Sequence, residues 1–121
     1  RSHQEGDWPV QVFRRTGAKG WNVNEAACFC TPKSGCIEIR KLRLRIHLSP
    51  GKPQQNRTDE NTIAATATKS TQSVPLVVRR QNTILVSLDA GAIVLKFRNK
   101  ADCLSFSDRL VSLNPSTAVT N

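Results

Sequence analysis

The segment at residues 92–113 constrains the fold of this chain most, because it changes from strand periodicity to helix periodicity across one short turn. "AIVLKFRN" alternates apolar and polar side chains, as a half-buried strand does. After Asn99 the apolar residues recur at a spacing of three and four, which predicts an amphipathic helix with Cys103, Phe106, Leu110 and Leu113 on its buried face and Leu104 and Val111 beside them. Asn99 can cap this helix, and Asp102 suits the positive end of its dipole. The helix needs a sheet to bury its apolar face.

The sequence before this segment predicts that sheet. Short β-type runs separated by turn residues occupy residues 8–15, 21–31, 36–48, 74–80, 82–89 and 92–99. The turn sequences are "TGAKG", "PKSG", "RQN" and "DAG". The expected fold class is mainly β with one C-terminal α-helix: about seven antiparallel strands that form a barrel or sandwich capped by the helix.

Residues 36–48 contain an irregularity in the strand pattern. Ile37 and Ile39 are odd-numbered, whereas the later apolar residues are even-numbered: Leu42, Leu44, Ile46 and Leu48. Side chains alternate between the two faces of a strand, so the apolar face must switch between residues 39 and 42. Because glycine is absent there, we expect a bulge or a bend rather than a tight hairpin.

The length of 121 residues suits one domain. We expect a disordered flank at residues 1–7, the domain at 8–113 and a flexible tail at 114–121. Residues 49–73 have few large apolar side chains and predict a long polar loop within the domain. The first residues contain no signal-peptide pattern, and no apolar run approaches the length of a membrane span. The sequence begins at Arg1 and contains no Met, so we expect a piece of a longer protein.

The stretch "ILVSLDAGAIVLKFRNKADCLSFSDRLVSL" resembles the end of a pleckstrin-homology (PH)-like domain, in which the last strand leads into a helix with an aromatic residue near its middle. Phe106 takes that position. Many PH domains have Trp nearer the helix start, where this chain has Ala, Asp, Cys and Leu at residues 101–104, so the resemblance lies in the pattern rather than in a motif. It implies a PH-like superfold, and a common superfold has many functions.

The charge of the chain favours acidic partners. Eighteen Lys and Arg residues outnumber nine Asp and Glu residues, which gives a formal net charge of +9. In "RKLRLRIH", the basic side chains of Lys41, Arg43, Arg45 and His47 are expected on one strand face, about 7 Å apart. This pattern is typical of a solvated outer face, and it also fits a stripe that binds nucleic acid or an acidic peptide. The residues expected to extend the stripe are Arg79 and Arg80, with Arg40, Lys96 and Arg98 as further neighbours.

A second basic group lies in "FRRTGAKG". The resemblance implies that Arg14, Arg15 and Lys19 occupy the loop with which lipid-binding PH domains hold an anionic headgroup. Those domains also have a second basic pair in the next strand. Here that strand reads "NEAACFC" and contains no basic residue, which argues against specific phosphoinositide binding. Weak association with anionic membranes requires only the net charge.

The cysteines and histidines give little support to metal binding or catalysis. Cys28 and Cys30 have the spacing C-x-C, which differs from the spacing of zinc ribbons and zinc fingers, and we expect both thiols on one strand face with Phe29 on the other. A Cys30–Cys36 disulfide is sterically conceivable; otherwise these residues and Cys103 are small core side chains. We expect no enzyme, no cofactor and no metal site.

These observations lead to one principal expectation and two alternatives. The principal one is a non-catalytic PH-like protein–protein interaction module of a larger intracellular scaffold or regulatory protein, which binds an acidic or amphipathic protein segment. The first alternative is a nuclear domain with nucleic-acid affinity, since PH-like domains occur in chromatin factors and in meiotic recombination scaffolds. The second is a membrane-targeting phosphoinositide domain. We expect an intracellular protein, with a nuclear location favoured over a cytoplasmic one.

Overall fold

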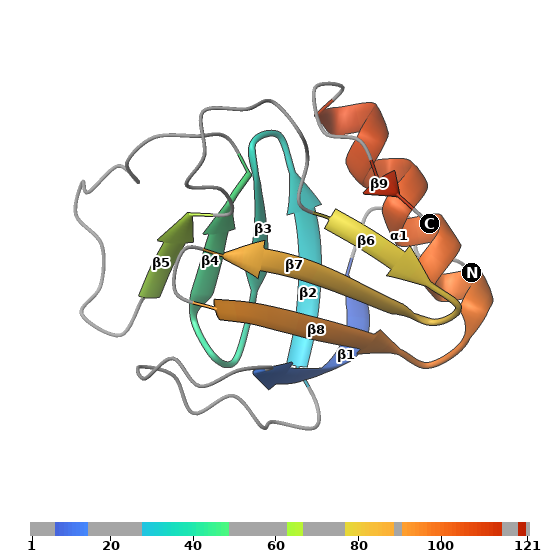
Figure 1. The fold of residues 1–121 in the computed structure, drawn as a ribbon, viewed down its shortest axis with the longest axis horizontal. Coiled ribbons are helices and arrows are strands. Elements are labelled where there is room, and N and C mark those ends of the chain that lie inside the picture. The colour runs from blue at the N-terminus through green and yellow to red at the C-terminus, as the bar shows by residue number, and fades with distance from the viewer. Residues whose placement is uncertain are drawn as a thin grey trace.

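The computed structural model describes residues 7–14, 28–48, 63–66, 77–88, 91–114 and 119–120. Seven antiparallel strands and one C-terminal helix that packs against them make up most of this part of the chain, as the sequence predicts (Figure 1). The fold is therefore mainly β.

The antiparallel strands form two meanders that belong to one sheet. The first meander contains β1 (Trp8–Arg14), β2 (Cys28–Lys33), β3 (Cys36–Ile39) and β4 (Leu44–His47). The second contains β6 (Val77–Arg80), β7 (Thr83–Leu88) and β8 (Gly91–Phe97). Antiparallel pairing of β1 with β8 joins them, with Val12 opposite Leu95. The strands of the two meanders cross steeply, so that the sheet wraps around a common interior (Figure 1).

Two short strands pair in parallel at the edges of this sheet. β5 (Ile63–Thr66) lies beside β4, and β9 (Val119–Thr120) lies beside β6. The sequence indicates neither strand: β5 falls within the expected polar loop, and β9 falls within the expected flexible tail. The rest of the expected loop at 49–73 lies outside the described residues, as do residues 1–6 of the expected flank at 1–7.

The alternation of apolar residues explains which face of each strand is buried. In β7, for example, Ile84, Val86 and Leu88 are buried and the residues between them are only half-buried. The same alternation in the other strands builds one core from residues that the sequence places on the inner face: Trp8, Val10, Val12, Cys28, Cys30, Ile37, Ile39, Leu44, Ile46, Val77, Ile93, Leu95 and Phe97.

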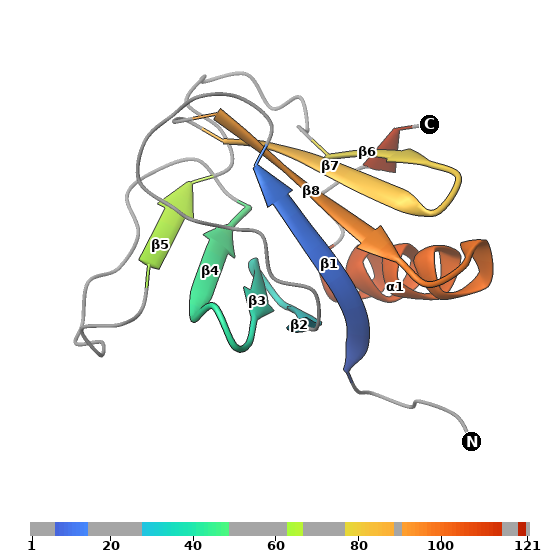
Figure 2. The same cartoon turned by 90° about the horizontal axis from the view of Figure 1, so that it is seen from below.

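The helix α1 (Lys100–Leu113) covers one end of this core and packs against β2, β7 and β8 (Figure 2). Its predicted cap is confirmed, because the Asn99 side chain accepts a hydrogen bond of 2.8 Å from the backbone N–H of Asp102. Cys103, Phe106 and Leu110 are fully buried, whereas Leu104 and Val111 are each 38% exposed and lie outside the core. Among the described residues, no helix has the length and apolar character that crossing a membrane requires.

Phe106 is the centre of the contact between the helix and the sheet. Its ring lies 5.4 Å from the Trp8 ring in an edge-to-face arrangement and 5.1 Å from the Phe97 ring. The aromatic residue near the middle of the helix therefore joins the first and the last antiparallel strands. This geometry explains why the apolar period of the helix is centred on Phe106.

Two expected turns differ in the structure. Pro32 and Lys33 belong to β2, so the first described turn consists of Ser34 and Gly35, with Gly35 at a φ of 84°. The second difference lies at residues 40–43, where the expected bulge or bend is instead a hairpin turn between β3 and β4. That hairpin explains the switch of apolar face, because β4 folds back on β3 and pairs Ile37 with Ile46 on the inner face.

Candidate partner-binding site

The β3–β4 turn places basic side chains in backbone conformations that glycine would adopt more easily. Lys41 has a φ of 80° and Arg43 has a φ of 57°, both in the left-handed region. The turn is anchored by the backbone N–H of Arg40, which donates a hydrogen bond of 2.7 Å to the carbonyl oxygen of Phe29 in β2. A non-glycine residue in the left-handed region is conformationally strained, and such strain often accompanies a functional requirement for the side chain.

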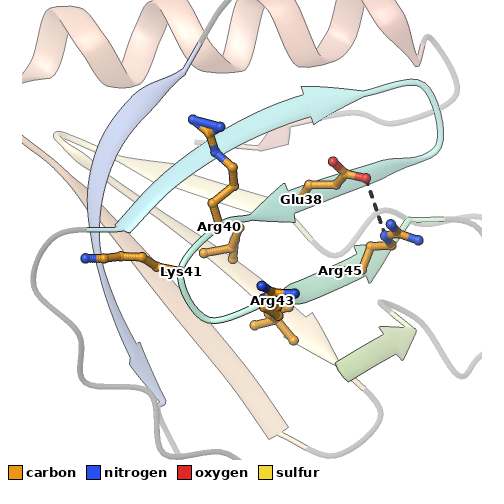
Figure 3. A pocket seen from close by; sticks show the side chains of 7 residues that line it. Glu38, Arg40, Lys41, Arg43 and Arg45 are labelled. Atoms are coloured by element: carbon orange, nitrogen blue, oxygen red, sulfur yellow. Dashed lines mark ion pairs between the residues drawn. The ribbon is translucent and has the colours of Figure 1, made fainter. Parts of the chain in front are cut away.

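An open pocket of about 510 Å³ surrounds this turn (Figure 3). Its charged lining consists of four cationic side chains and one carboxylate: Arg40, Lys41, Arg43, Arg45 and Glu38. Ile39 and Leu44 complete the lining. Figure 3 shows Arg45 reaching toward Glu38, while Arg40 and Lys41 extend to other sides of the turn. The cations therefore spread over an area, and they suit a partner with several anionic groups better than one small anion.

Glu38 organises one side of the pocket. Its Oε2 lies 3.4 Å from Nε of Arg45, and its Oε1 lies 3.4 Å from Nζ of Lys33. The pairing with Arg45 follows from the register, since Glu38 and Arg45 are cross-strand partners on the outer face of β3 and β4. Such exposed ion pairs are weak, so this carboxylate orients the two basic side chains more than it removes their attraction for anions.

Arg40 organises the opposite side. Its guanidinium lies over the Phe29 ring, with 5.9 Å between the Cζ atom and the ring centroid, and it forms an ion pair with Asp7. The Thr31 hydroxyl donates a hydrogen bond of 2.8 Å to the other carboxylate oxygen of Asp7. These contacts hold Arg40 against the outer face of β2, where Phe29 is 40% exposed.

The structure brings together only part of the predicted basic stripe. Lys41, Arg43 and Arg45 line the pocket, but Lys41 and Arg43 lie in the turn, so the expectation of one continuous face along a strand is wrong. The reason is the left-handed backbone at residues 41 and 43, which turns the chain before β4 begins. His47 lies two residues beyond Arg45 on the outer face of β4, and burial together with the Arg45 charge lowers its pKa below the ordinary value of 6.5.

The predicted residues in β6 do not join this cluster. Nη1 of Arg79 donates a hydrogen bond of 3.2 Å to the Ser107 hydroxyl, so Arg79 faces the helix. Arg80 is exposed at the end of β6, on the outer face of the second meander. Of the expected headgroup residues, Arg15 and Lys19 lie outside the described residues, and Arg14 is the last residue of β1.

The four cysteines have free thiols in the structure. Cys28, Cys30 and Cys103 are buried in the core, and burial raises the pKa of Cys103 to about 11 and that of Cys30 well above its ordinary value. Cys36 is only half-buried and belongs to the outer-face positions of β3, so a Cys30–Cys36 disulfide is not formed. Within the described residues, no group of three His, Cys, Asp or Glu side chains is arranged to hold a metal ion.

Sequence reasoning did not identify Glu38, Phe29 and Asp7 as neighbours of the basic side chains. The alternation of β3 places Glu38 on the outer face, but the pairing with Arg45 depends on the hairpin register. Asp7 falls in the expected disordered flank. No family model matches this chain, and comparisons with curated proteins and with solved structures found no significant match.

Proposed function

We propose that this chain is a non-catalytic PH-like interaction module, and that the pocket around the β3–β4 turn binds an acidic segment of a partner protein. The observation that carries the proposal is that four cations, Arg40, Lys41, Arg43 and Arg45, line one pocket with a single carboxylate, and that two of them have left-handed backbone conformations. The PH-like assignment is supported by the seven antiparallel strands and by the helix that covers the core through Phe106.

The lining of the pocket favours an acidic peptide over a single-stranded nucleic acid. Proteins that bind single-stranded nucleic acid place aromatic rings among their basic residues, so that bases can stack on them. None of the described residues that line this pocket is aromatic. The nearby Phe29 ring already has the Arg40 guanidinium over it. An extended peptide needs only carboxylates at intervals, which the spread of the cationic side chains can contact. The parent is then a larger intracellular scaffold or regulatory protein.

The test is a titration of the folded chain with a synthetic peptide of about twelve residues rich in Glu and Asp, at about 50 and about 200 mM salt. Duplex DNA, single-stranded RNA and phosphoinositide liposomes are titrated in parallel. The double variant Lys41→Glu, Arg43→Glu should weaken peptide binding by tenfold or more, because it reverses two charges in the pocket. A tenfold change in Kd corresponds to about 1.4 kcal/mol of binding free energy.

The matched control reverses two exposed cations on the helix, Lys100→Glu and Arg109→Glu, which changes the net charge equally. If both double variants weaken peptide binding to the same extent, the attraction is due to net charge and the proposed site is wrong. Tighter binding of DNA or RNA than of the peptide, lost only in the turn variant, would assign the site to nucleic acid instead. The same result with liposomes would favour membrane targeting.

A further inference from the structure

The outer face of the second meander and β1 has a row of apolar side chains that the core does not use. Cross-strand pairing places Phe13 of β1 opposite Val94 of β8, Val94 opposite Leu85 of β7, and Leu85 opposite Val78 of β6. We call these four residues the apolar row. The row lies on the outer face of the sheet, because the buried neighbours of these residues along the strands belong to the core that α1 covers: Val12, Val77, Ile84, Val86, Ile93 and Leu95.

The apolar row is exposed enough to contact another molecule. Phe13 is 40% exposed, and Val94, Leu85 and Val78 are half-buried. Valine and leucine alone would be ordinary cross-strand packing on a sheet. The exposed Phe13 ring extends this packing into a contiguous apolar strip on the solvent face of an antiparallel sheet, which is usually polar, and such contiguous strips mark interaction sites.

A polar and basic row runs beside it. Gln11 lies opposite Lys96, Lys96 lies opposite Thr83, and Thr83 lies opposite Arg80. This second row is two residues away along each strand, which corresponds to about 7 Å. Both Lys96 and Arg80 are exposed, and among the described residues no acidic side chain forms an ion pair with Lys96. The surface therefore combines an apolar strip with positive charge along one side.

The spacing of the apolar row fits a helix that crosses the strands. Neighbouring strands lie about 4.8 Å apart, so four adjacent side chains span about 14 Å. On an α-helix, apolar residues at positions i, i+3, i+7 and i+10 span about 15 Å, at about 1.5 Å per residue. An apolar stripe of one helix can thus contact all four side chains of the row, with an acidic flank of the same helix above Lys96 and Arg80.

We propose that this face of the sheet binds an acidic amphipathic helix of a partner protein. The apolar stripe of that helix packs on Phe13, Val94, Leu85 and Val78, and carboxylates on one flank pair with Lys96 and Arg80. The inference does not rest on the proposed function, because the apolar row lies on β1, β8, β7 and β6, whereas the acidic-segment pocket lies on β3 and β4.

The experiment uses a designed helical peptide of about eighteen residues, with Leu at the four stripe positions and Glu along one flank. It is titrated into the isotopically labelled chain, and backbone amide chemical shifts are followed. We expect the largest shifts at the apolar row and at Lys96. A control peptide of the same composition, in which Leu and Glu are placed in alternating order so that no apolar stripe can form, should not bind.

Two variants test the contacts separately. Phe13→Ser should weaken binding by about tenfold, as expected when the largest apolar side chain of a binding surface is removed. Lys96→Glu changes an exposed side chain that the fold does not need, and it should weaken binding about fivefold through the acidic flank. Leu104→Ser is the matched control, because Leu104 has a similar exposure of 38% but lies on α1, away from the row. The turn variant Lys41→Glu, Arg43→Glu should leave this titration unchanged.

Three results would overturn the proposal. The first is equal loss of binding in Phe13→Ser and Leu104→Ser. The second is chemical-shift changes that concentrate at the β3–β4 turn, which would mean that the peptide binds only through its carboxylates. The third is self-association by light scattering that Phe13→Ser abolishes while the peptide does not bind, which would assign the face to a second copy of this chain.

Discussion

Replacement of Phe106 by alanine tests the contact on which the described fold depends most. Phe106 is completely buried and touches the rings of Trp8 and Phe97. Removal of a buried phenylalanine side chain costs about 3–5 kcal/mol, and the loss of two ring contacts places this site above the lower end of that range. We therefore expect Phe106→Ala to lower the free energy of unfolding by about 4 kcal/mol. The total free energy of unfolding of a small domain is about 5–15 kcal/mol, so the variant should be only marginally stable.

The assay is urea denaturation followed by far-ultraviolet circular dichroism. With a slope of about 2 kcal/mol per molar urea, the loss shifts the midpoint down by about 2 M. Phe106→Leu keeps most of the apolar volume and should cost about 1–2 kcal/mol, so the site stays measurable if the alanine variant does not fold. Leu104→Ala is the control on the same helix, where a side chain 38% exposed should contribute less than about 1 kcal/mol. If the two alanine variants lose equal stability, the helix does not pack through Phe106.

Three further predictions concern single side chains. Asn99→Ala should lower the free energy of unfolding by about 1 kcal/mol, because the first turn of α1 loses its cap, and Asn99→Asp should restore most of that loss in the same urea assay. Because the pKa of His47 is lowered from 6.5, the unfolded chain binds a proton more readily than the folded chain just below pH 6.5. The contribution of His47 to stability should therefore be fully present above pH 6.5, and the free energy of unfolding should fall as the pH decreases from 6.5 toward the lowered pKa of the folded state. His47→Gln should flatten that decline between about pH 7 and about pH 5, and an unchanged decline would contradict the assignment. Alkylation of the folded chain should modify Cys36 first, since the other three thiols are buried. Mass spectrometry should find all four cysteines modified only after unfolding. Modification of Cys103 as fast as that of Cys36 would contradict this prediction and show that α1 opens readily.

The elements of this fold were largely predictable because each has a local signal. Alternation identified the inner face of the strands, and the spacing of Phe106 and Leu110 identified the buried face of the helix. Leu104 and Val111 were placed beside the core but are exposed, because the sheet covers a narrower stripe of the helix than its apolar residues suggest. The parallel pairing of β5 with β4 and of β9 with β6 has no sequence signal of its own, since each short strand needs only a few residues beside an existing strand.

The candidate site was only partly predictable because it depends on one turn. Without glycine at residues 40–43, the sequence favoured a bulge, and the basic residues were expected along one strand. The left-handed conformations of Lys41 and Arg43 replace that stripe with a turn that spreads the charges around a pocket. Register then decides the remaining contacts, such as Glu38 with Arg45, and register between strands is not a property of any single segment.

The pairing of β1 with β8 has a consequence for how this chain reaches its native state. Each meander is built from neighbouring segments, but Val10 pairs with Phe97, near the opposite end of the chain. Closing so large a loop costs conformational entropy before any contact compensates it, so the joining of the meanders is expected to limit the folding rate. During synthesis the first meander leaves the ribosome long before β8, with the apolar faces of β1 to β4 uncovered. A chaperone that holds this half of the sheet would therefore be needed most in the interval before β8 and the helix appear.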